Sequence, residues 1–241
     1  MNKIILCEGA TDAILLSYYL EKTAGWKFCH KPPKDLQIKE DRIEESVNWY
    51  EKGKDRLLIC GVGGKDRIKP FFENKIEPSI VNADSFEKVA LLLDRDDRDI
   101  PSMENHASSM FSPIVSKAVQ NRWTANQYIN GFGQDKTVEM LLVVIPEEHQ
   151  GALETVLLDA IAEEPYDAHI IECVESFVKE MRVEASKYIC NDRKELKAKL
   201  GVTWAVQYPE KVFKLIDEQI KSVKWEESEI LKKCFEELIK I

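Results

Sequence analysis

The stretch Val89-Ala90-Leu91-Leu92-Leu93-Asp94-Arg95-Asp96-Asp97 decides the fold of this chain. Five apolar residues in succession are typical of a strand that is buried on both faces, as in parallel sheets. The acids follow at once and therefore lie at the carboxyl end of the strand. Open α/β sheets bind their ligands at this end.

Asp94 and Asp96 are two residues apart, so their side chains point the same way if the strand geometry continues through them. Two carboxylates held together repel unless a cation separates them, which favours a divalent metal. The same residues are also consistent with a solvated acidic turn from Asp94 to Asp99. An EF-hand is excluded, because Arg98 stands at a ligand position and Asp99 where that loop requires glycine.

Length and composition predict a globular protein of one domain, or of one domain with an appendage, since the chain has 241 residues and 44% hydrophobic composition. The net charge of −9 argues against a generally basic nucleic-acid surface but allows a local one. Six scattered cysteines without a Cys-x-x-Cys pair indicate reduced core residues. Neither a secretory signal nor a membrane-spanning run is recognisable, so we expect a cytoplasmic protein without membrane association.

The amino-terminal segment repeats the pattern of a strand followed by an acid. Residues 3–7 predict a strand, and a helix follows to about residue 22, with Thr11 as its cap and Asp12 near its positive end. If this strand is parallel to the one at 89–93, Glu8, Asp94 and Asp96 reach the same sheet edge, with Asp12 beside them. Taken singly, Glu8 is equally consistent with an exposed loop acid and Asp12 with a simple cap.

A third strand, at residues 56–60, runs into the turn Gly61-Val62-Gly63-Gly64-Lys65. Such a turn presents backbone N–H groups to a phosphate or lets another chain segment approach closely. It matches neither a Walker loop nor Gly-x-Gly-x-x-Gly. Gly63, Gly64 and Lys65 are candidates for nucleic-acid backbone contacts, and the alternative is a tight turn without a ligand.

The remaining chain supplies one more strand and several helices. Residues 138–145 predict a strand, and the following helix at 151–162 carries Glu154 near the same edge, either as a ligand or as a surface acid. Shorter segments predict a helix at 46–50, a helix at 102–121 that Pro113 interrupts, and a turn at 130–133. Beyond Pro165 the pattern is helical, over 168–189, 194–206, 209–223 and 228–241.

Strand-like runs that alternate with helices predict an α/β fold, a Rossmann-like, mostly parallel sheet flanked by helices. Pro165 marks the expected boundary between a domain at residues 1–165 and a helical C-terminal extension at residues 166–241 that packs on it.

The ordered combination of strand-Glu-Gly-x-x-Asp, strand-glycine turn and strand-Asp-x-Asp resembles the Toprim domain of topoisomerases, bacterial primases and certain nucleases. Glu8, Asp94, Asp96 and the Gly61–Gly64 turn carry the resemblance, which covers residues 1–165 well and the tail loosely. Asp12 and the helix with Glu154 look like the overcoming-lysogenization-defect (OLD) nucleases and their small stand-alone Toprim relatives.

This resemblance implies five acids, Glu8, Asp12, Asp94, Asp96 and Glu154, around two Mg²⁺ or Mn²⁺ ions, and a lysine from the helical part. Lys197 is the best match, with Lys199 and Lys194 as competitors. Glu8 is either a metal ligand or a general base. Oxygen ligands without His or Cys favour Mg²⁺ or Mn²⁺ over zinc.

The function that the resemblance implies is a metal-dependent endonuclease that hydrolyses phosphodiester bonds of DNA, in phage defence or repair. Its catalytic residues would be Glu8, Asp94, Asp96 and Lys197. The alternatives are a non-catalytic module that binds nucleic acid or nucleotide through a metal, and a primase-like nucleotidyl transferase. An ATPase or sensor partner protein and a homo-oligomer stay open, because related domains work beside such partners.

Overall fold

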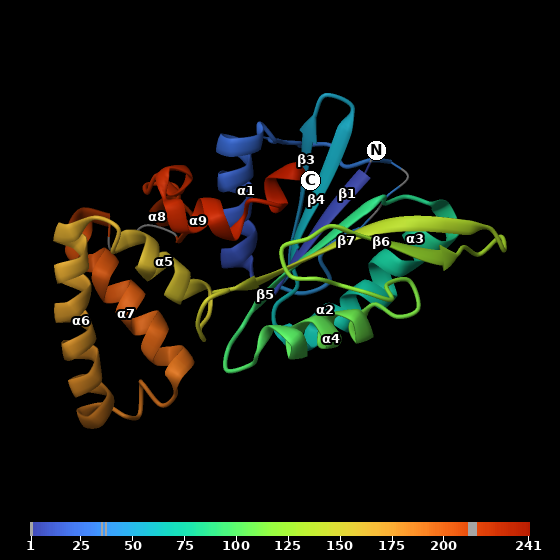
Figure 1. Ribbon diagram of the computed structural model, residues 1–241. Helices are drawn as coiled ribbons and strands as arrows, with labels where there is room; N and C mark the ends of the chain where they lie inside the picture. The colour runs from blue at the N-terminus through green and yellow to red at the C-terminus, as the bar shows by residue number, and fades with distance from the viewer. Residues whose placement is uncertain (1, 35, 37, 212–215) are drawn as a thin grey trace.

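The computed structural model describes residues 2–34, 36, 38–211 and 216–241 (Figure 1). At its centre lies a seven-stranded sheet in the order β2-β3-β4-β1-β5-β7-β6. The strands are β1 (Asn2–Cys7), β2 (Lys27–Phe28), β3 (Ser46–Lys52), β4 (Asp55–Gly61), β5 (Lys88–Asp94), β6 (Thr124–Ile129) and β7 (Asp135–Ile145). The four strands that the sequence predicts are all present.

The four central strands β4, β1, β5 and β7 are parallel, and β2, β3 and β6 extend the sheet as antiparallel strands. The predicted α/β class is therefore confirmed. β1 lies between β4 and β5, so the chain leaves the central strand first to one side and later to the other. Such a reversal opens a crevice at the carboxyl ends of the strands, which is where open α/β sheets bind ligands.

The sheet is buried on both faces, because alternate residues of each central strand point to opposite sides. Ile5, Ile59 and Leu92 join the cluster on one face, and Ile4, Leu58 and Leu91 join the cluster on the other. The first face packs against α1 (Ala10–Ala24) and α5 (Leu153–Ile161). The second packs against α2 (Ile68–Phe71), the π-helical turn η2 (Phe72–Ile76), α3 (Glu77–Ala83) and α4 (Ile100–Met110).

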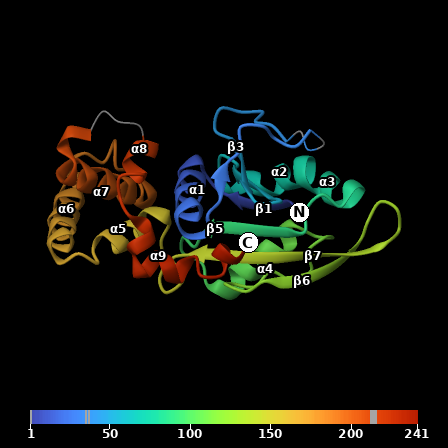
Figure 2. The ribbon, with the colours of Figure 1, turned by 90° about the horizontal axis from the view of Figure 1, so that it is seen from above.

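The C-terminal part is helical, as predicted, and it begins with α6 at the expected boundary, Pro165. It contains α6 (Pro165–Glu184), α7 (Asp192–Gln207), η3 (Pro209–Lys211), α8 (Ile216–Ile220), η4 (Trp225–Glu227), α9 (Glu229–Cys234) and η5 (Leu238–Lys240). Residues 212–215 of the helix predicted at 209–223 lie outside the described residues. The antiparallel pair α6 and α7 extends away from the sheet (Figure 2).

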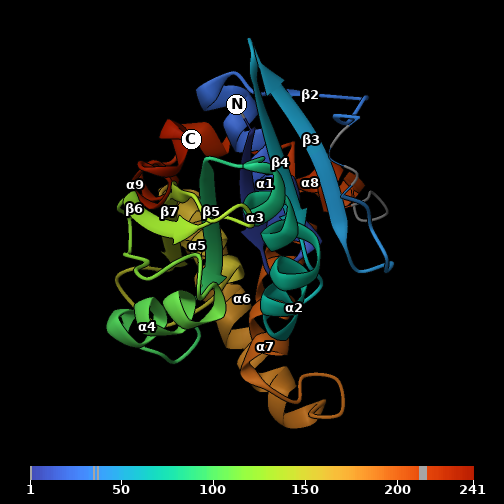
Figure 3. The ribbon, with the colours of Figure 1, turned by 90° about the vertical axis from the view of Figure 1, so that its right-hand side faces the viewer.

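The core of the first sheet face continues into this helical part. Trp204, Trp225 and Phe235 belong to the same apolar cluster as Leu16 of α1 and Leu157 of α5. The Nε1 of Trp123 donates to the carbonyl of Glu237 at 3.0 Å, which attaches the C-terminus to the sheet. Figure 3 shows α7 running below the carboxyl ends of the strands.

Several local predictions differ from the structure. Residues 46–50 form strand β3 and not a helix, since pairing with β4 buries Trp49 on one face and Tyr50 on the other. Short apolar segments do not distinguish the two structures by pattern alone. Helix α4 ends at Met110, and β6 was not anticipated. Gly9, not Thr11, is the N-cap of α1.

Among the described residues, no helix is both long and apolar enough to cross a membrane.

Candidate metal-binding and phosphate-binding site

Two acids from neighbouring parallel strands meet at the carboxyl edge of the sheet. Glu8 directly follows β1, and Asp94 is the last residue of β5. The Oε1 of Glu8 accepts a hydrogen bond from the backbone N–H of Asp94 at 3.1 Å. Both side chains are buried, with 3% of Glu8 and 6% of Asp94 exposed. Parallel pairing of β1 with β5 thus joins residues that are distant in the sequence.

Two helices add further acids to this edge. Asp12 lies in the first turn of α1, and its Oδ2 accepts from the backbone N–H of Gly9 at 2.8 Å, which satisfies a free donor of the helix start. The Oδ1 of Asp94 accepts from the backbone N–H of Leu153 at 2.9 Å, at the start of α5. Glu154, the next residue, is thereby brought to the same place.

These four acids line one pocket of about 230 Å³, which we call the acidic pocket. Its wall consists of Glu8, Gly9, Thr11, Asp12, Gly63, Gly64, Asp94, Leu153, Glu154, Arg193 and Lys197. The pocket therefore combines carboxylates from β1, β5, α1 and α5 with two cations from α7.

The three buried carboxylates are poorly compensated by protein groups. Burial raises the pKa of Glu8 to about 7, although Lys65 acts in the opposite direction. Burial and the negative charge of Glu8 raise the pKa of Asp94 to about 7. Burial and the charge of Asp94 raise the pKa of Asp12 to about 7. Each ionised form is thus disfavoured by loss of water and by its neighbours, and a bound cation would reverse both effects.

Helix α7 supplies the positive charge opposite the acids. The Nζ of Lys197 lies 3.0 Å from Oε1 of Glu154. Lys199 is buried and pairs instead with Glu175 and Glu195, at 3.2 and 3.1 Å. Lys194 is exposed and does not line the acidic pocket. Of the three lysines that the sequence suggests, Lys197 is the one at the pocket.

Asp96 does not join the other acids. Strand β5 ends at Asp94, and Asp96 has a φ of 54°, so strand alternation does not continue to it. Its Oδ2 pairs with the Nζ of Lys65 at 2.8 Å, and about half of the Asp96 side chain is exposed. Lys65 also donates to the backbone oxygen of Asp94 at 3.2 Å. Lys65 therefore connects the exit of β4 to the exit of β5.

The glycine turn lies against the loop that carries Glu8. The backbone N–H of Gly64 donates to the Glu8 carbonyl at 2.7 Å, so this N–H is already used within the protein. A Cβ on Gly61 would lie 2.4 Å from the Gly9 oxygen, which is possible only for glycine. Gly63 and Gly64 have φ values of 81° and 134°, in the region that favours glycine. The turn positions Glu8 and forms part of the pocket wall.

All four side chains offer carboxylate oxygens, the ligand type that Mg²⁺ and Mn²⁺ prefer, and three of the four are buried. Within residues 2–34, 36, 38–211 and 216–241, no group of three or more His, Cys, Asp or Glu side chains is close enough to hold a metal ion. The carboxylates line a common pocket but do not form a closed coordination group.

Sequence reasoning missed Arg193, which lines the acidic pocket together with Lys197. The two residues are four apart on α7, the spacing that places side chains on one helix face. The sequence spacing of four residues therefore indicates that Arg193 lies on the same helix face as Lys197.

Comparisons with known proteins give a family and one distant structural neighbour. The crystal structure of hypothetical protein PH0156 from Pyrococcus horikoshii OT3 is 17% identical, with a TM-score of 0.48, and the match covers 98% of this chain and 99% of that one. No curated protein matches the chain. The model of the family described as protein of unknown function (DUF3226) matches residues 2–240. The chain therefore belongs to the DUF3226 family.

Proposed function

We propose that this protein is an Mg²⁺- or Mn²⁺-dependent endonuclease that hydrolyses phosphodiester bonds of DNA. The observation that carries the proposal is the convergence of Glu8, Asp12, Asp94 and Glu154 on one pocket that also contains Lys197 and Arg193. Carboxylates in such a cavity can bind a divalent metal ion, and cationic side chains beside them can bind the phosphate of a substrate that the metal also contacts. The resemblance of the acid and glycine pattern to Toprim nucleases contributes the choice of DNA.

In this proposal Glu8, Asp12, Asp94 and Glu154 hold the cations. Divalent ions held by these residues would neutralise charge on the scissile phosphate and would lower the pKa of a water molecule. Asp94 is oriented by the N–H of Leu153, and Glu8 by the N–H of Asp94. These hydrogen bonds fix the carboxylates before the substrate arrives. The alternative role of Glu8 is that of a general base, which would apply if Glu8 did not hold a cation, since burial then raises its pKa to about 7.

Lys197 and Arg193 neutralise the phosphate from the opposite wall. The ion pair of Lys197 with Glu154 keeps its Nζ within the pocket while leaving 55% of the side chain exposed. Arg193 adds a planar guanidinium, which binds phosphate oxygens in pairs. A preorganised cation of this kind stabilises negative charge that develops during phosphoryl transfer.

Incubation of supercoiled plasmid with purified protein and Mg²⁺ or Mn²⁺ tests the proposal. We expect nicked or linear DNA with the wild type, and a loss of at least about 100-fold for Asp94→Asn and Glu8→Gln, since both remove a charged ligand. Asp97→Asn is the matched control, because Asp97 is an exposed acid of the same loop that does not line the pocket. Nicking that persists in Asp94→Asn or in chelator would refute the assignment.

A binding module that uses a single metal is a second candidate, and the position of Asp96 favours it. The carboxylate of Asp96 pairs with Lys65 and lies outside the acidic pocket, which leaves four acids there instead of five. Calorimetric titration with Mn²⁺ distinguishes the candidates. A stoichiometry of two Mn²⁺ ions per chain supports hydrolysis with paired ions. One Mn²⁺ ion per chain, together with no cleavage of the plasmid, supports a binding role.

A further inference from the structure

A larger, differently charged pocket adjoins the acidic one. It has a volume of about 730 Å³, and it shares Gly63, Gly64 and Arg193 with the acidic pocket. Eight of its thirteen lining residues are charged, and five of these are cationic. We call it the basic pocket. A charged lining of this kind does not suit an apolar ligand. A substrate longer than the acidic pocket would extend from there into the basic pocket.

Three arginines of the basic pocket are available to a ligand. Arg42, Arg67 and Arg193 line it, and all three are exposed. In the described part of the chain, no ion pair or side-chain hydrogen bond engages their guanidinium groups. The acid Asp66 is also present on this wall. Unpaired arginines around a cavity favour a ligand with several phosphates, because each guanidinium presents a fork of donors to phosphate oxygens.

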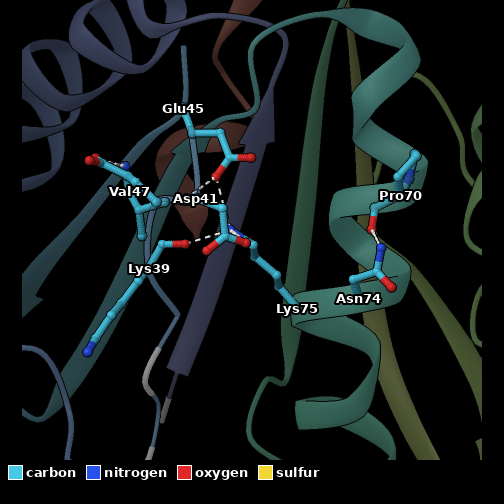
Figure 4. A network of polar contacts seen from close by, with 8 residues as sticks. Lys39, Asp41, Glu45, Val47, Pro70, Asn74 and Lys75 are labelled. Carbon is cyan, nitrogen blue, oxygen red and sulfur yellow. Dashed lines mark hydrogen bonds and ion pairs between the residues drawn. The ribbon is translucent and has the colours of Figure 1, made fainter. Parts of the chain in front are cut away.

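The outer wall of the basic pocket is held in place by Lys75. Its Nζ lies 2.9 Å from Oε2 of Glu45, 3.0 Å from Oδ2 of Asp41 and 2.6 Å from the carbonyl of Lys39. Figure 4 shows this side chain reaching from the helix that contains Asn74 to the loop with Asp41 and Glu45. Lys75 offsets only one of these two acidic charges, but the lining as a whole keeps five cations against three acids, Asp41, Glu45 and Asp66.

We propose that the basic pocket binds phosphates that flank the scissile one, so that the substrate is a polynucleotide whose sugar-phosphate backbone crosses the Gly63–Gly64 turn. The inference rests on the proposed function, because it takes the acidic pocket as the place of cleavage. Arg193 reaches both pockets and binds the phosphate between them. Arg42 and Arg67 bind the phosphates further along the strand.

Fluorescence anisotropy with a short labelled single-stranded oligonucleotide tests the inference, with Ca²⁺ in place of Mg²⁺ so that binding is read without cleavage. The variant Arg42→Gln/Arg67→Gln is expected to bind at least about tenfold more weakly. The slope of log K against log salt should fall by about 1.4, since each lost phosphate contact of a single strand contributes about 0.7. Each single substitution should reduce the salt slope by about 0.7, half of the effect of the double variant. Comparing the affinities for DNA and RNA oligonucleotides of the same sequence shows which of the two sugar-phosphate backbones the protein prefers.

Arg122→Gln is the matched control, because Arg122 is exposed, lies before β6 at the other edge of the sheet and lines neither pocket. Binding that is unchanged in the double variant, equally reduced in Arg122→Gln, or absent in the wild type would overturn the inference. Hydrolysis of bis(p-nitrophenyl) phosphate by the wild type tests the acidic pocket separately, since this diester is too short to reach both pockets. Its failure would contradict the proposed function while the binding result still decides the inference.

Discussion

Asp94 joins three parts of the candidate site through its own atoms. Its backbone N–H donates to Glu8, its Oδ1 accepts from the N–H of Leu153, and its carbonyl accepts from Lys65. The residue therefore links the ends of β1, β4 and β5 with the start of α5. Its carboxylate is one of three buried acids at the pocket, and burial together with the negative charge of Glu8 raises its pKa to about 7.

The buried acids predict a pH dependence of stability. Glu8, Asp12 and Asp94 have ordinary pKa values of 4.5, 3.8 and 3.8, and burial raises each to about 7. Between the ordinary pKa values and the raised values of about 7, the folded protein binds more protons than the unfolded chain. The free energy of unfolding therefore falls as the pH rises through this range. In chelator, thermal unfolding should therefore occur at a lower temperature at pH 8 than at pH 5.5.

The variant Asp94→Asn isolates this effect, because it removes one buried charge. At pH 8 it should be more stable than the wild type by up to about 4 kcal/mol, since one pKa unit corresponds to about 1.4 kcal/mol. The difference should shrink at pH 5.5, and Mn²⁺ should stabilise the wild type more than the variant. Asp97→Asn is the control. Equal pH profiles for wild type and Asp94→Asn would contradict the assignment of buried, uncompensated charge.

Gly61 predicts a steric effect at the same site. In Gly61→Ala the new Cβ would lie 2.4 Å from the Gly9 oxygen, so the loop that follows Glu8 must move. We expect a loss of about 1–3 kcal/mol in stability, as for other overpacked positions, and weaker Mn²⁺ binding. Gly201→Ala is the control, because a Cβ there meets nothing within 4 Å in helix α7 and should stabilise by about 0.5–1 kcal/mol. Urea denaturation measures both changes.

At the scale of the element, α7 has two faces with different tasks. Arg193 and Lys197 face the pockets, whereas Lys199 is buried between Glu175 of α6 and Glu195 of α7 itself. The same helix therefore presents cations to a ligand and holds the antiparallel pair α6 and α7 together. Lys197 and Lys199 are close in sequence but have different contacts, because they lie on different faces of α7.

This division predicts opposite behaviour for two neighbouring lysines. Lys199→Ala should reduce stability by about 1–3 kcal/mol, because it leaves Glu175 without its lysine and removes one of the two cations that contact Glu195, the other being Arg182. Lys197→Ala should cost less stability than Lys199→Ala, since 55% of the Lys197 side chain is exposed, against 12% for its partner Glu154 and 10% for Lys199. Lys197→Ala should instead lower plasmid cleavage at least about tenfold. A stability loss for Lys197→Ala as large as that for Lys199→Ala would contradict this division.

At the scale of the molecule, one apolar cluster spans the sheet face and the C-terminal helices. Leu16, Leu157, Trp204, Trp225 and Phe235 all belong to it. The boundary expected at Pro165 coincides with the start of α6, but the core does not end there. Removal of the C-terminal part would expose the apolar sides of α1 and α5.

A chain truncated after residue 164 is therefore expected not to fold. Circular dichroism should show no cooperative thermal transition, and size-exclusion chromatography should show aggregates, because a large apolar surface is exposed. The full chain is the control in both measurements. A truncated protein that unfolds cooperatively and resists proteolysis would instead establish residues 1–164 as an independent domain.

The amino-acid sequence by itself determined the α/β class, the four central strands and the sheet edge at which Glu8 and Asp94 emerge. Each of these follows from local pattern, since a continuous apolar run followed by an acid has the same meaning wherever it occurs. The place of Asp12 and Glu154 at the pocket also agrees with the positions of these two residues in the first turns of their helices, whereas Lys197 was expected from the resemblance alone.

Only the tertiary structure decided the rest, because it depends on contacts between distant segments. Pairing with β4 turned residues 46–52 into a strand, and the left-handed backbone at Asp96 directed its carboxylate to Lys65 and away from the pocket. The packing of α7 across the strand ends brought Arg193 to both pockets. Local pattern contains no information on such contacts, since they arise when separate elements bury their apolar faces against one another.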